Sequence, residues 1–299
     1  SVCAVARLMR VMVIYNPVSG RGRSCKSAGA IAELLVCVPC DVELVQTKPT
    51  SPTQWLLPKL QYNPDAIVVV GGDGTLRQIA SIAKDTNIPV YHAACGTENL
   101  FAKSMAVSGT PEVVVEKIKQ RATSTIDTAT ANDSFMLLMA SVGFDAAVVA
   151  DLAEHRGTSI THFSYIMPMV RQLLRWTVPT VSITVDDREV VSKQKGWVVV
   201  ANSKAYARGL NPARNADIAD GKLDIVFFPL TGRWSFYKWI RLLSRGTHLH
   251  HPNVVYIQGV AVVVKTEETA QWQIDGDPAG ATKSMKISCV PKSLVVFAS

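Results

Sequence analysis

The feature that most constrains this chain is a short apolar run that ends in a glycine-rich loop. Residues Ile67 to Val70 are consecutive aliphatic side chains, which predicts a buried strand. The run continues into Gly71-Gly-Asp-Gly-Thr75, and the residues after Leu76 have a helical pattern. Glycines let backbone N–H groups approach phosphate oxygens, and the N-terminus of a helix attracts negative charge. This order of elements therefore predicts a turn that binds phosphate groups.

Asp73 is an unusual residue for such a turn, because a carboxylate beside phosphate groups is expected only if the site also binds a cation or transfers a proton. The alternative is an ordinary strand-to-helix turn in which Asp73 caps the helix that follows. We favour phosphate binding because glycines lie on both sides of the carboxylate, which a cap does not require.

Composition limits the remaining choices. A chain of 299 residues that is 48% hydrophobic can form a large core, and we expect two domains. The net charge of +7 favours anionic partners, which include nucleotides, nucleic acid and acidic membranes. Six cysteines in this length do not form a disulfide framework, so we expect a reducing, cytoplasmic compartment and read Cys37-Val-Pro-Cys40 as structural. No apolar run approaches the roughly 20 residues that span a bilayer, so any membrane contact is expected to be peripheral.

Strand-like and helical segments alternate in the first part of the chain. Strands are predicted at Val11 to Tyr15, Asp41 to Gln46, Ile67 to Val70 and Pro89 to His92, and helices up to about Leu35, at Thr53 to Leu60 and at Leu76 to Ala83. This alternation predicts a doubly wound, mostly parallel sheet in an α/β domain.

The pattern changes after Thr125, where short strand-like runs separated by turn signals predominate. They lie at Ser134 to Ala140, Val181 to Val185, Trp197 to Ala201, Leu223 to Phe228, Val254 to Ile257, Val260 to Val264, Gln271 to Ile274, Met285 to Cys289 and Leu294 to Phe297. Helical inserts are predicted at Thr161 to Trp176 and Arg233 to Arg245. This density of strands predicts an antiparallel, β-rich sandwich or barrel with helical inserts.

Two common phosphate-binding patterns do not fit the basic loop that follows the first strand. Cys25 stands where a P-loop needs the glycine before its lysine, and it also replaces the third glycine of the dinucleotide pattern. Ser19, Arg21 and Arg23 nevertheless follow a strand at the sheet edge where ligands bind, and an arginine-rich solvated turn is the equal alternative.

An ordered series of motifs extends over nearly the whole chain. In order, these are Asn16-Pro-Val-Ser-Gly-Arg-Gly22, Gly71-Gly-Asp-Gly-Thr75, Gly96-Thr-Glu-Asn99, Gly143-Phe-Asp-Ala146, Ala201-Asn202 with Tyr206 and Gly209, Asp220-Gly-Lys-Leu-Asp224 and Asp275-Gly-Asp-Pro278. Together they resemble the diacylglycerol kinase catalytic-domain family, particularly its bacterial lipid kinases, which are related to sphingosine and ceramide kinases and to the NAD kinase-like superfamily.

The resemblance implies both an architecture and a reaction. It implies a nucleotide-binding α/β domain over residues 1–125, a β-rich lipid domain over residues 126–289, a last strand at about 290–299 that returns to the first domain, and an active site in the cleft between them. The implied reaction transfers the γ-phosphoryl group of ATP to a lipid hydroxyl with Mg²⁺, which requires positioning, charge neutralisation and a base.

The resemblance also assigns residues by their place in the motifs. The implied nucleotide contacts are Asn16, Ser19, Gly20, Thr47, Gly71, Gly72, Asp73, Gly74, Thr75, Gly96, Thr97 and Asn99. Asp277 matches the implied proton acceptor, where Glu is more common, and Asp275 and Asp73 are the other catalytic candidates. The alternative for Asp275-Gly-Asp-Pro278 is a common hairpin turn.

An implied metal site lies in the second domain. Asp217, Asp220 and the backbone of Lys222 match a structural metal site of the family, and a turn with two unpaired acids is the equal alternative. Three departures from the family pattern bear on nucleotide affinity and metal handling: Arg77-Gln78 replaces Asn-Glu, Ala94-Cys95 replaces a Pro, and Asn99-Leu100 replaces Asn-Asp.

The segment from Arg233 to Arg245 predicts an amphipathic helix with Phe236, Trp239, Ile240 and Leu243 on one face. Such a helix suits an acidic membrane surface, but we favour the alternative that it packs on the sheet. His248, His250 and His251 after it are expected to form an exposed loop.

These inferences lead to one functional prediction with two rivals. We predict an ATP- and Mg²⁺-dependent lipid kinase of phospholipid biosynthesis that acts at a membrane surface, with a diacylglycerol-like or sphingoid acceptor. The rivals are an NAD kinase, which shares the glycine loop, and a non-catalytic nucleotide- or lipid-binding protein, which the departures at Arg77-Gln78 and Ala94 suggest. We expect no nucleic-acid partner, and a homodimer is one possible assembly.

Overall fold

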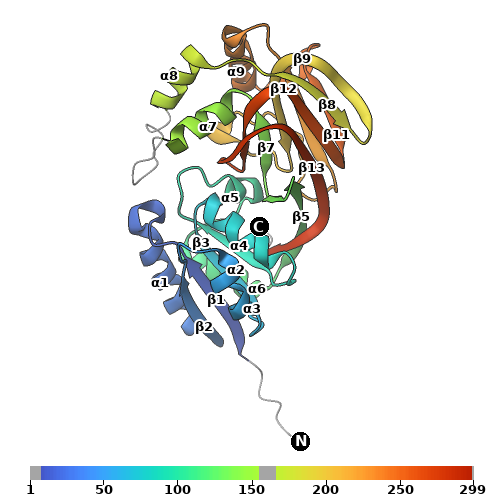
Figure 1. Ribbon diagram of the computed structural model, residues 1–299. Coiled ribbons are helices and arrows are strands. Elements are labelled where there is room, and N and C mark those ends of the chain that lie inside the picture. The colour runs from blue at the N-terminus through green and yellow to red at the C-terminus, as the bar shows by residue number, and fades with distance from the viewer. Residues whose placement is uncertain (1–7, 155–165, 298–299) are drawn as a thin grey trace, which may run out of the picture. The chain divides into compact units, whose positions relative to one another are not determined.

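The computed structural model describes residues 8–154 and 166–297, which form two compact units (Figure 1). One unit consists of residues Ser1–Thr125 together with Ser293–Ser299, and we call it the α/β unit. The other consists of Ile126–Lys292, and we call it the β-rich unit. An α/β unit and a β-rich unit are the two kinds of domain that the sequence predicts, and each is described separately below.

The α/β unit is built on a parallel sheet. Its strands are ordered β2 (Cys40–Gln46), β1 (Met9–Tyr15), β3 (Ala66–Gly71) and β4 (Val90–Ala94), followed by the end of β13 (Asp277–Phe297), where Val296 pairs with Val90. All of β3 is buried, as its unbroken aliphatic run predicts for a strand covered on both faces.

Helices cover this sheet. They are α1 (Arg23–Val36), α2 (Pro52–Trp55), α3 (Leu57–Leu60), α4 (Asp73–Ala83), α5 (Leu100–Met105) and α6 (Pro111–Gln120). Ile31 of α1 and Ile118 of α6 pack with Val13, Val68 and Phe297 in one core on one face of the sheet. The predicted helix at 53–60 is instead two short helices, because Pro58 at the start of α3 has no N–H to continue the hydrogen-bond pattern of α2. The helices α5 and α6 were not predicted.

The β-rich unit is an antiparallel arrangement. Its strands are β5 (Thr123–Ala131), β6 (Ser134–Met136), β7 (Met139–Val142), β8 (Thr180–Val185), β9 (Arg188–Ala201), β10 (Leu223–Pro229), β11 (Val255–Gly259), β12 (Ala261–Ile274) and most of β13. The pairing order is β11-β10-β9-β7-β12-β13, and β8 also pairs with both β12 and β9. Its core contains Trp272, Phe227 and Met285 together with aliphatic side chains from seven of these strands.

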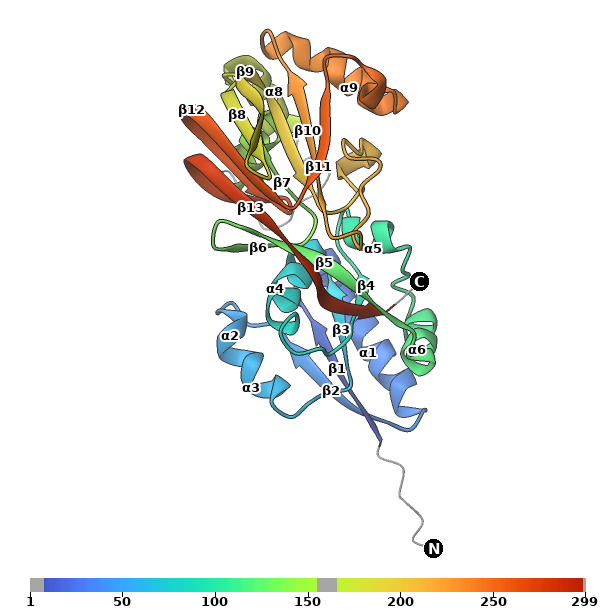
Figure 2. The ribbon, with the colours of Figure 1, turned by 90° about the vertical axis from the view of Figure 1, so that its right-hand side faces the viewer.

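Several strands differ from the prediction in length. The predicted strands at 260–264 and 271–274 form, apart from Val260, one strand, β12, whose register shift between Lys265 and Ala270 interrupts the alternating pattern. Residues 285–289 and 294–297 likewise lie in the single strand β13, which is 21 residues long and is drawn in red in Figure 2. The predicted strand at 134–140 is divided into β6 and β7.

The helices of the β-rich unit are α7 (Phe144–Glu154), α8 (Ile166–Arg175) and α9 (Phe236–Arg245). α7 was not predicted, whereas α8 and α9 fall within the two predicted inserts, of which residues 161–165 lie outside the described part of the chain. Among the described residues, no helix has the length and apolarity needed to cross a bilayer.

Candidate functional site

Three loops meet at one edge of the parallel sheet because the carboxyl ends of β1, β3 and β4 lie there together. We call residues 16–22, 71–75 and 95–99 the glycine loops. The Asn16 side chain donates from Nδ2 to Thr75 Oγ1 at 3.1 Å, and its backbone N–H donates to Val70 O at 3.2 Å. The Cys95 N–H donates to Gly71 O at 2.8 Å, so each loop is hydrogen-bonded to the loop or strand end beside it.

The glycines of these loops are required by close packing. A Cβ atom on Gly96 would lie 2.7 Å from Gly72 Cα, and one on Gly71 would lie 2.8 Å from Thr75 Cβ. Gly20 has a φ of +58°, and a Cβ there would lie 2.5 Å from Cys95 O. At Gly20 and Gly96 the loops therefore pack backbone against backbone, and a larger residue at either position would force them apart.

The N-terminus of α4 has no side-chain cap among the described residues. Its N-cap is Gly72, and Thr75 in the first turn is buried against Asn16. The N–H groups at the start of a helix have no partner within the helix, and they carry the positive end of its dipole. This turn therefore has the features of an anion-binding site.

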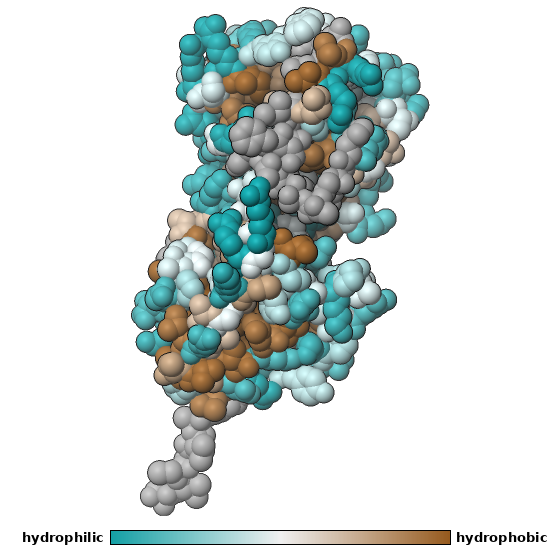
Figure 3. All heavy atoms as spheres, turned by 90° about the vertical axis from the view of Figure 1, so that its left-hand side faces the viewer, coloured by the Kyte–Doolittle hydropathy of each residue, from teal (hydrophilic) through white to brown (hydrophobic). Residues whose placement is uncertain are grey.

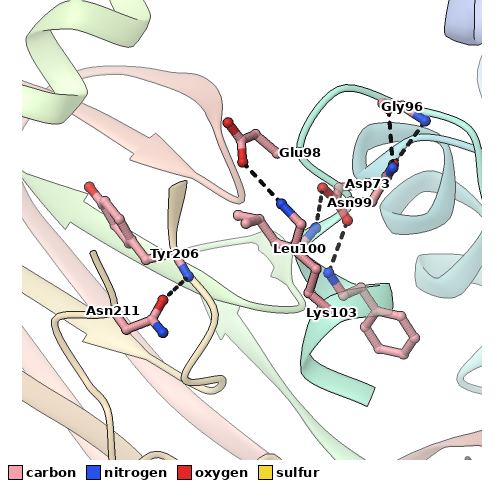
Figure 4. A network of polar contacts seen from close by, with 9 residues as sticks. Asp73, Gly96, Glu98, Asn99, Leu100, Lys103, Tyr206 and Asn211 are labelled. Atoms are coloured by element: carbon pink, nitrogen blue, oxygen red, sulfur yellow. Dashed lines mark hydrogen bonds and ion pairs between the residues drawn. The ribbon is translucent and has the colours of Figure 1, made fainter. Parts of the chain in front are cut away.

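Asp73 caps a helix other than its own. Its carboxylate accepts the N–H groups of Leu100 at 2.8 Å and Phe101 at 3.1 Å, at the start of α5 (Figure 4). The alternative in which Asp73 caps the helix after its own loop is therefore wrong. Both carboxylate oxygens are occupied, and the bonds join the loop after β3 to the helix after β4.

Two further side chains stabilise the glycine loops. Asn99 has a φ of +52°, and its side chain accepts the Gly96 N–H at 2.8 Å and donates to Gly96 O at 3.1 Å (Figure 4).

Buried His92 contacts Gly71 O through Nε2 at 3.1 Å, and because a carbonyl only accepts, Nε2 carries the proton. Burial lowers the pKa of His92, which keeps the ring neutral. Sequence reasoning missed His92, since an isolated histidine in an apolar strand gives no signal.

The other predicted nucleotide contacts lie along the same edge. The Thr47 N–H, just after β2, donates to Tyr15 O at 2.9 Å, and the Ser19 N–H donates to Asn16 O at 3.0 Å. Gly74 and Thr97 are exposed on the two later loops. The side chain of Lys103 forms an ion pair with Glu98 at 3.4 Å beside Asn99.

In the β-rich unit, the turn between β12 and β13 contains Asp275 and Gly276, with φ values of +53° and +84°. This is the hairpin alternative from the sequence analysis. The Asp275 carboxylate is buried and accepts the N–H groups of Leu137, Leu138 and Met139 at 2.7–2.9 Å. Asp277 follows at the start of β13 and is less buried. The two acids of the turn thus have different environments, and Asp275 anchors the turn.

The predicted metal residues lie on a turn before β10. Asp217 Oδ1 accepts the Ala219 N–H at 3.0 Å, and Asp220 Oδ1 accepts the Lys222 N–H at 2.9 Å. Burial raises the pKa of the nearby Asp224, and the charges of Asp220 and Asp217 add to that shift. The described residues contain no cluster of three or more His, Cys, Asp or Glu side chains arranged to hold a metal. Carboxylate and backbone oxygens are the type of donor that Mg²⁺ prefers, and the metal site stays a prediction.

Buried Asp127, which sequence reasoning missed, holds this turn. Its carboxylate accepts the Gly221 N–H at 2.6 Å and the Lys292 N–H at 2.7 Å. The Thr-rich sequence around Asp127 does not indicate that its hydrogen-bond partners are residues distant in the sequence.

The helix α9 packs on the sheet, as the favoured alternative predicted. Phe236, Trp239 and Leu243 are buried, whereas Trp234 and Tyr237 are exposed and stack with ring centroids 5.8 Å apart. The prediction of an exposed histidine loop is wrong for His248, which is fully buried with Nε2 bonded to Pro212 O at 2.8 Å.

Two family profiles match adjacent parts of the chain. The profile described as the diacylglycerol kinase catalytic domain matches residues 10–131. The profile described as the YegS C-terminal NAD kinase beta sandwich-like domain matches residues 139–298, which is more than half of the chain.

Individual proteins agree with the profiles. The chain is 26% identical to the diacylglycerol kinase of Mycobacterium tuberculosis (strain H37Rv) over 295 residues, which cover 96% of this chain and 94% of that protein. It is 22% identical to the diacylglycerol kinase of Staphylococcus saprophyticus, with 91% and 90% covered. A crystal structure of a diacylglycerol kinase from Bacillus anthracis (strain Sterne) has the same fold, with a TM-score of 0.72 at 20% identity and 97% of each chain covered.

Proposed function

This chain belongs to the diacylglycerol kinase catalytic-domain family, and from that membership we propose that it is an ATP-dependent lipid kinase. It transfers the γ-phosphoryl group of ATP to the hydroxyl group of a diacylglycerol-like or sphingoid lipid. The observation that carries the proposal is the N-terminus of α4, which has no side-chain cap in the described part of the chain and lies among glycine loops whose backbones approach closely at Gly20, Gly72 and Gly96. This arrangement supports binding of a polyphosphate.

The glycine loops hold the nucleotide in this proposal. The N–H groups of Gly72 to Thr75 bind phosphate oxygens, while Asn16 keeps the first loop in register with the second and Asn99 fixes the shape of the third. Asp73 accepts two backbone N–H groups at the start of α5, so its role in this proposal is to hold the loops. Arg77 and Gln78 lie on α4 beyond this turn.

Asp277 is the proton acceptor for the lipid hydroxyl in this proposal. The Asp275 carboxylate is fully used by backbone N–H groups, which leaves Asp277 as the acid of the turn with the more accessible position. Asp217, Asp220 and the Lys222 carbonyl would hold Mg²⁺, which when bound neutralises negative charge and orders the turn before β10.

The lipid is reached by peripheral contact with an acidic membrane. The exposed Trp234 and Tyr237 lie beside the cations Lys238, Arg241 and Arg245 of α9, a combination that suits a bilayer interface. A cavity of about 390 Å³ at the base of α9 is lined by residues that include Lys195 and Lys238. Apolar residues also interrupt the hydrophilic surface of the β-rich unit (Figure 3). The cytoplasmic location and the homodimer stay predictions.

The test is phosphoryl transfer from labelled ATP to a panel of diacylglycerol, ceramide, sphingosine and polyprenol in vesicles. We expect one lipid class to be labelled and the Asp277→Ala variant to lose that activity. Transfer to none of the lipids would contradict the proposal. Formation of NADP from NAD would instead identify an NAD kinase, and ATP binding in calorimetry without any turnover would identify a non-catalytic relative.

A further inference from the structure

A chain of buried hydrogen bonds begins at the turn that carries Asp277. Besides the bonds of Asp275, the turn is held at Gly276, whose N–H donates to Gln273 Oε1 at 2.8 Å. The other end of the Gln273 amide donates from Nε2 to Ser141 Oγ at 2.8 Å. Gln273 and Ser141 lie opposite each other on β12 and β7, and both are almost fully buried. The Gln273 side chain therefore fills the space between the turn and the neighbouring strand.

The hydrogen bonds continue from Ser141 to a buried acid. Ser141 Oγ donates to Asp145 Oδ2 at 2.5 Å, and Tyr206 donates its phenolic hydrogen to the same oxygen at 2.5 Å. Asp145 lies in the first turn of α7, and Tyr206 lies in the loop after β9. The Tyr206 backbone is held in turn by Asn211 Oδ1 at 3.0 Å (Figure 4). Four side chains from four separate segments thus form one continuous path.

The direction of each bond is determined by its neighbours. Ser141 has one hydrogen, which it gives to Asp145, so it accepts from Gln273. Gln273 must then present its oxygen to the Gly276 N–H. Burial raises the pKa of Tyr206 well above its usual value, so the phenol keeps the hydrogen that it donates. From Gly276 and from Tyr206, each group donates its hydrogen towards Asp145. Turning the Gln273 side-chain amide over would break its bonds to both Gly276 and Ser141.

We propose that Gln273, Ser141, Asp145 and Tyr206 are positioning residues that hold the Asp275–Asp277 turn, so that the backbone from which Asp277 reaches the lipid hydroxyl is fixed. The inference rests on the proposed role of Asp277. A two-residue turn with positive φ values closes a hairpin without any side-chain partner for its N–H groups. The buried glutamine is therefore an additional constraint on the turn. Burying its polar amide costs free energy unless all of its hydrogen bonds are made.

The central experiment compares Gln273→Met with Gln271→Met, a matched control at an exposed glutamine of the same strand. We expect Gln273→Met to lower kcat on the labelled lipid by about 10- to 100-fold, the effect of a displacement near 1 Å at a reacting group. KM for ATP should change less than twofold, and Gln271→Met should match the wild type. Equal kcat values in the two variants would overturn the proposal.

A second pair of variants separates positioning from loss of packing. In Gln273→Glu, the protonated carboxyl can donate to Ser141 and accept from Gly276, whereas the ionised form cannot donate. The ratio of its kcat to that of the wild type should therefore rise as pH falls from 8 to 5. Tyr206→Phe should lower kcat less than Gln273→Met because it lies at the far end of the path. A pH-independent ratio would contradict the assigned bonds.

Hydrogen exchange tests the inference independently of lipid kinase activity. Amide exchange in the peptide that contains Gly276 and Asp277 should be faster in Gln273→Met than in the wild type or in Gln271→Met. If the wild type phosphorylates no lipid, the proposed function fails, and this measurement alone decides whether the path holds the turn. Unchanged exchange would overturn the inference even if the enzyme is active.

Discussion

The carboxylate of Asp73 accepts the backbone N–H of Leu100 at 2.8 Å, so a residue in the loop after β3 caps the helix after β4. The bond joins two of the three glycine loops by a charged contact at the edge where we propose that ATP binds. Any change that moves one of these loops is therefore expected to move the other.

Neutralising Asp73 tests this coupling. Asp73→Asn keeps one acceptor oxygen but removes the charge at the N-terminus of α5, and the free energy of unfolding should fall by about 1 kcal/mol. Lipid kinase activity should fall as well. Urea denaturation and the labelled-ATP assay measure the two effects. Asp85→Asn, at an exposed acid that pairs with Lys84 at the surface, should leave both unchanged. An Asp73→Asn variant with wild-type stability and activity would argue against the coupling.

The close approach of Gly96 and Gly72 gives a second prediction. The added Cβ of Gly96→Ala would lie 2.7 Å from Gly72 Cα, so the loops must separate, and we expect activity to fall by about 100-fold. Gly29→Ala is the control, because a Cβ there meets nothing within 4 Å on α1, and helix propensity should raise stability by up to about 1 kcal/mol. Steady-state kinetics with ATP as the varied substrate distinguishes the two variants. Similar kinetics for both would contradict the proposed role of the loops.

The two acids of the β12–β13 turn should respond differently to the same substitution. Asp275→Asn replaces a carboxylate that accepts three backbone N–H groups, and we expect a loss of about 3 kcal/mol in unfolding free energy. Asp277→Asn should change stability by no more than about 0.5 kcal/mol but lower kcat by about 10²- to 10⁴-fold, as expected for loss of a general base. Thermal unfolding measures the stability of both variants, and kcat measures their activity. Full activity in Asp277→Asn would remove its assignment as the base.

Burial of His92 predicts a loss of stability in mild acid. Its pKa is lowered in the folded protein by burial, so below the unfolded value of about 6.5 the unfolded chain binds more protons. The stabilising contribution is therefore complete above that pH and is lost as pH falls through it. The wild type should lose more unfolding free energy than His92→Gln between pH 7.5 and 5.5 in urea titrations. Parallel pH profiles would show that the ring is not held neutral.

The reactivity of the cysteines tests whether Cys289 is buried in the folded protein. Burial raises the pKa of Cys289 to about 11, whereas Cys25 and Cys37 are exposed. Iodoacetamide at pH 8 should label the two exposed thiols and leave Cys289 unmodified in the native protein. Mass spectrometry of peptides from native and urea-unfolded samples provides the comparison. Rapid native labelling of Cys289 would contradict its burial.

Local patterns predicted the parallel strands well, because β3 is an uninterrupted apolar run that ends in glycine and β2 alternates between polar and apolar residues. Patterns failed where a strand is half exposed: β12 contains polar residues and a register shift between Lys265 and Ala270, so one strand resembled two. They also failed for partners distant in the sequence. Nothing near Asp275 indicates that Leu137 lies beside it, and nothing near His248 indicates that Pro212 O buries its ring. The types of residue at the candidate site were predictable, but their hydrogen bonds were not.

The strand β13 makes the α/β unit discontinuous in sequence, because Phe297 packs against Tyr91 with ring centroids 6.1 Å apart. During synthesis on a ribosome, β1 to β4 emerge first, yet the core that they form is completed only after every residue of the β-rich unit has been made. A nascent chain therefore carries an unfinished α/β unit through most of its translation. Polypeptides that end before residue 293 and isolated fragments of residues 1–125 should consequently depend on chaperones, and the unit that begins folding first is the last to be completed.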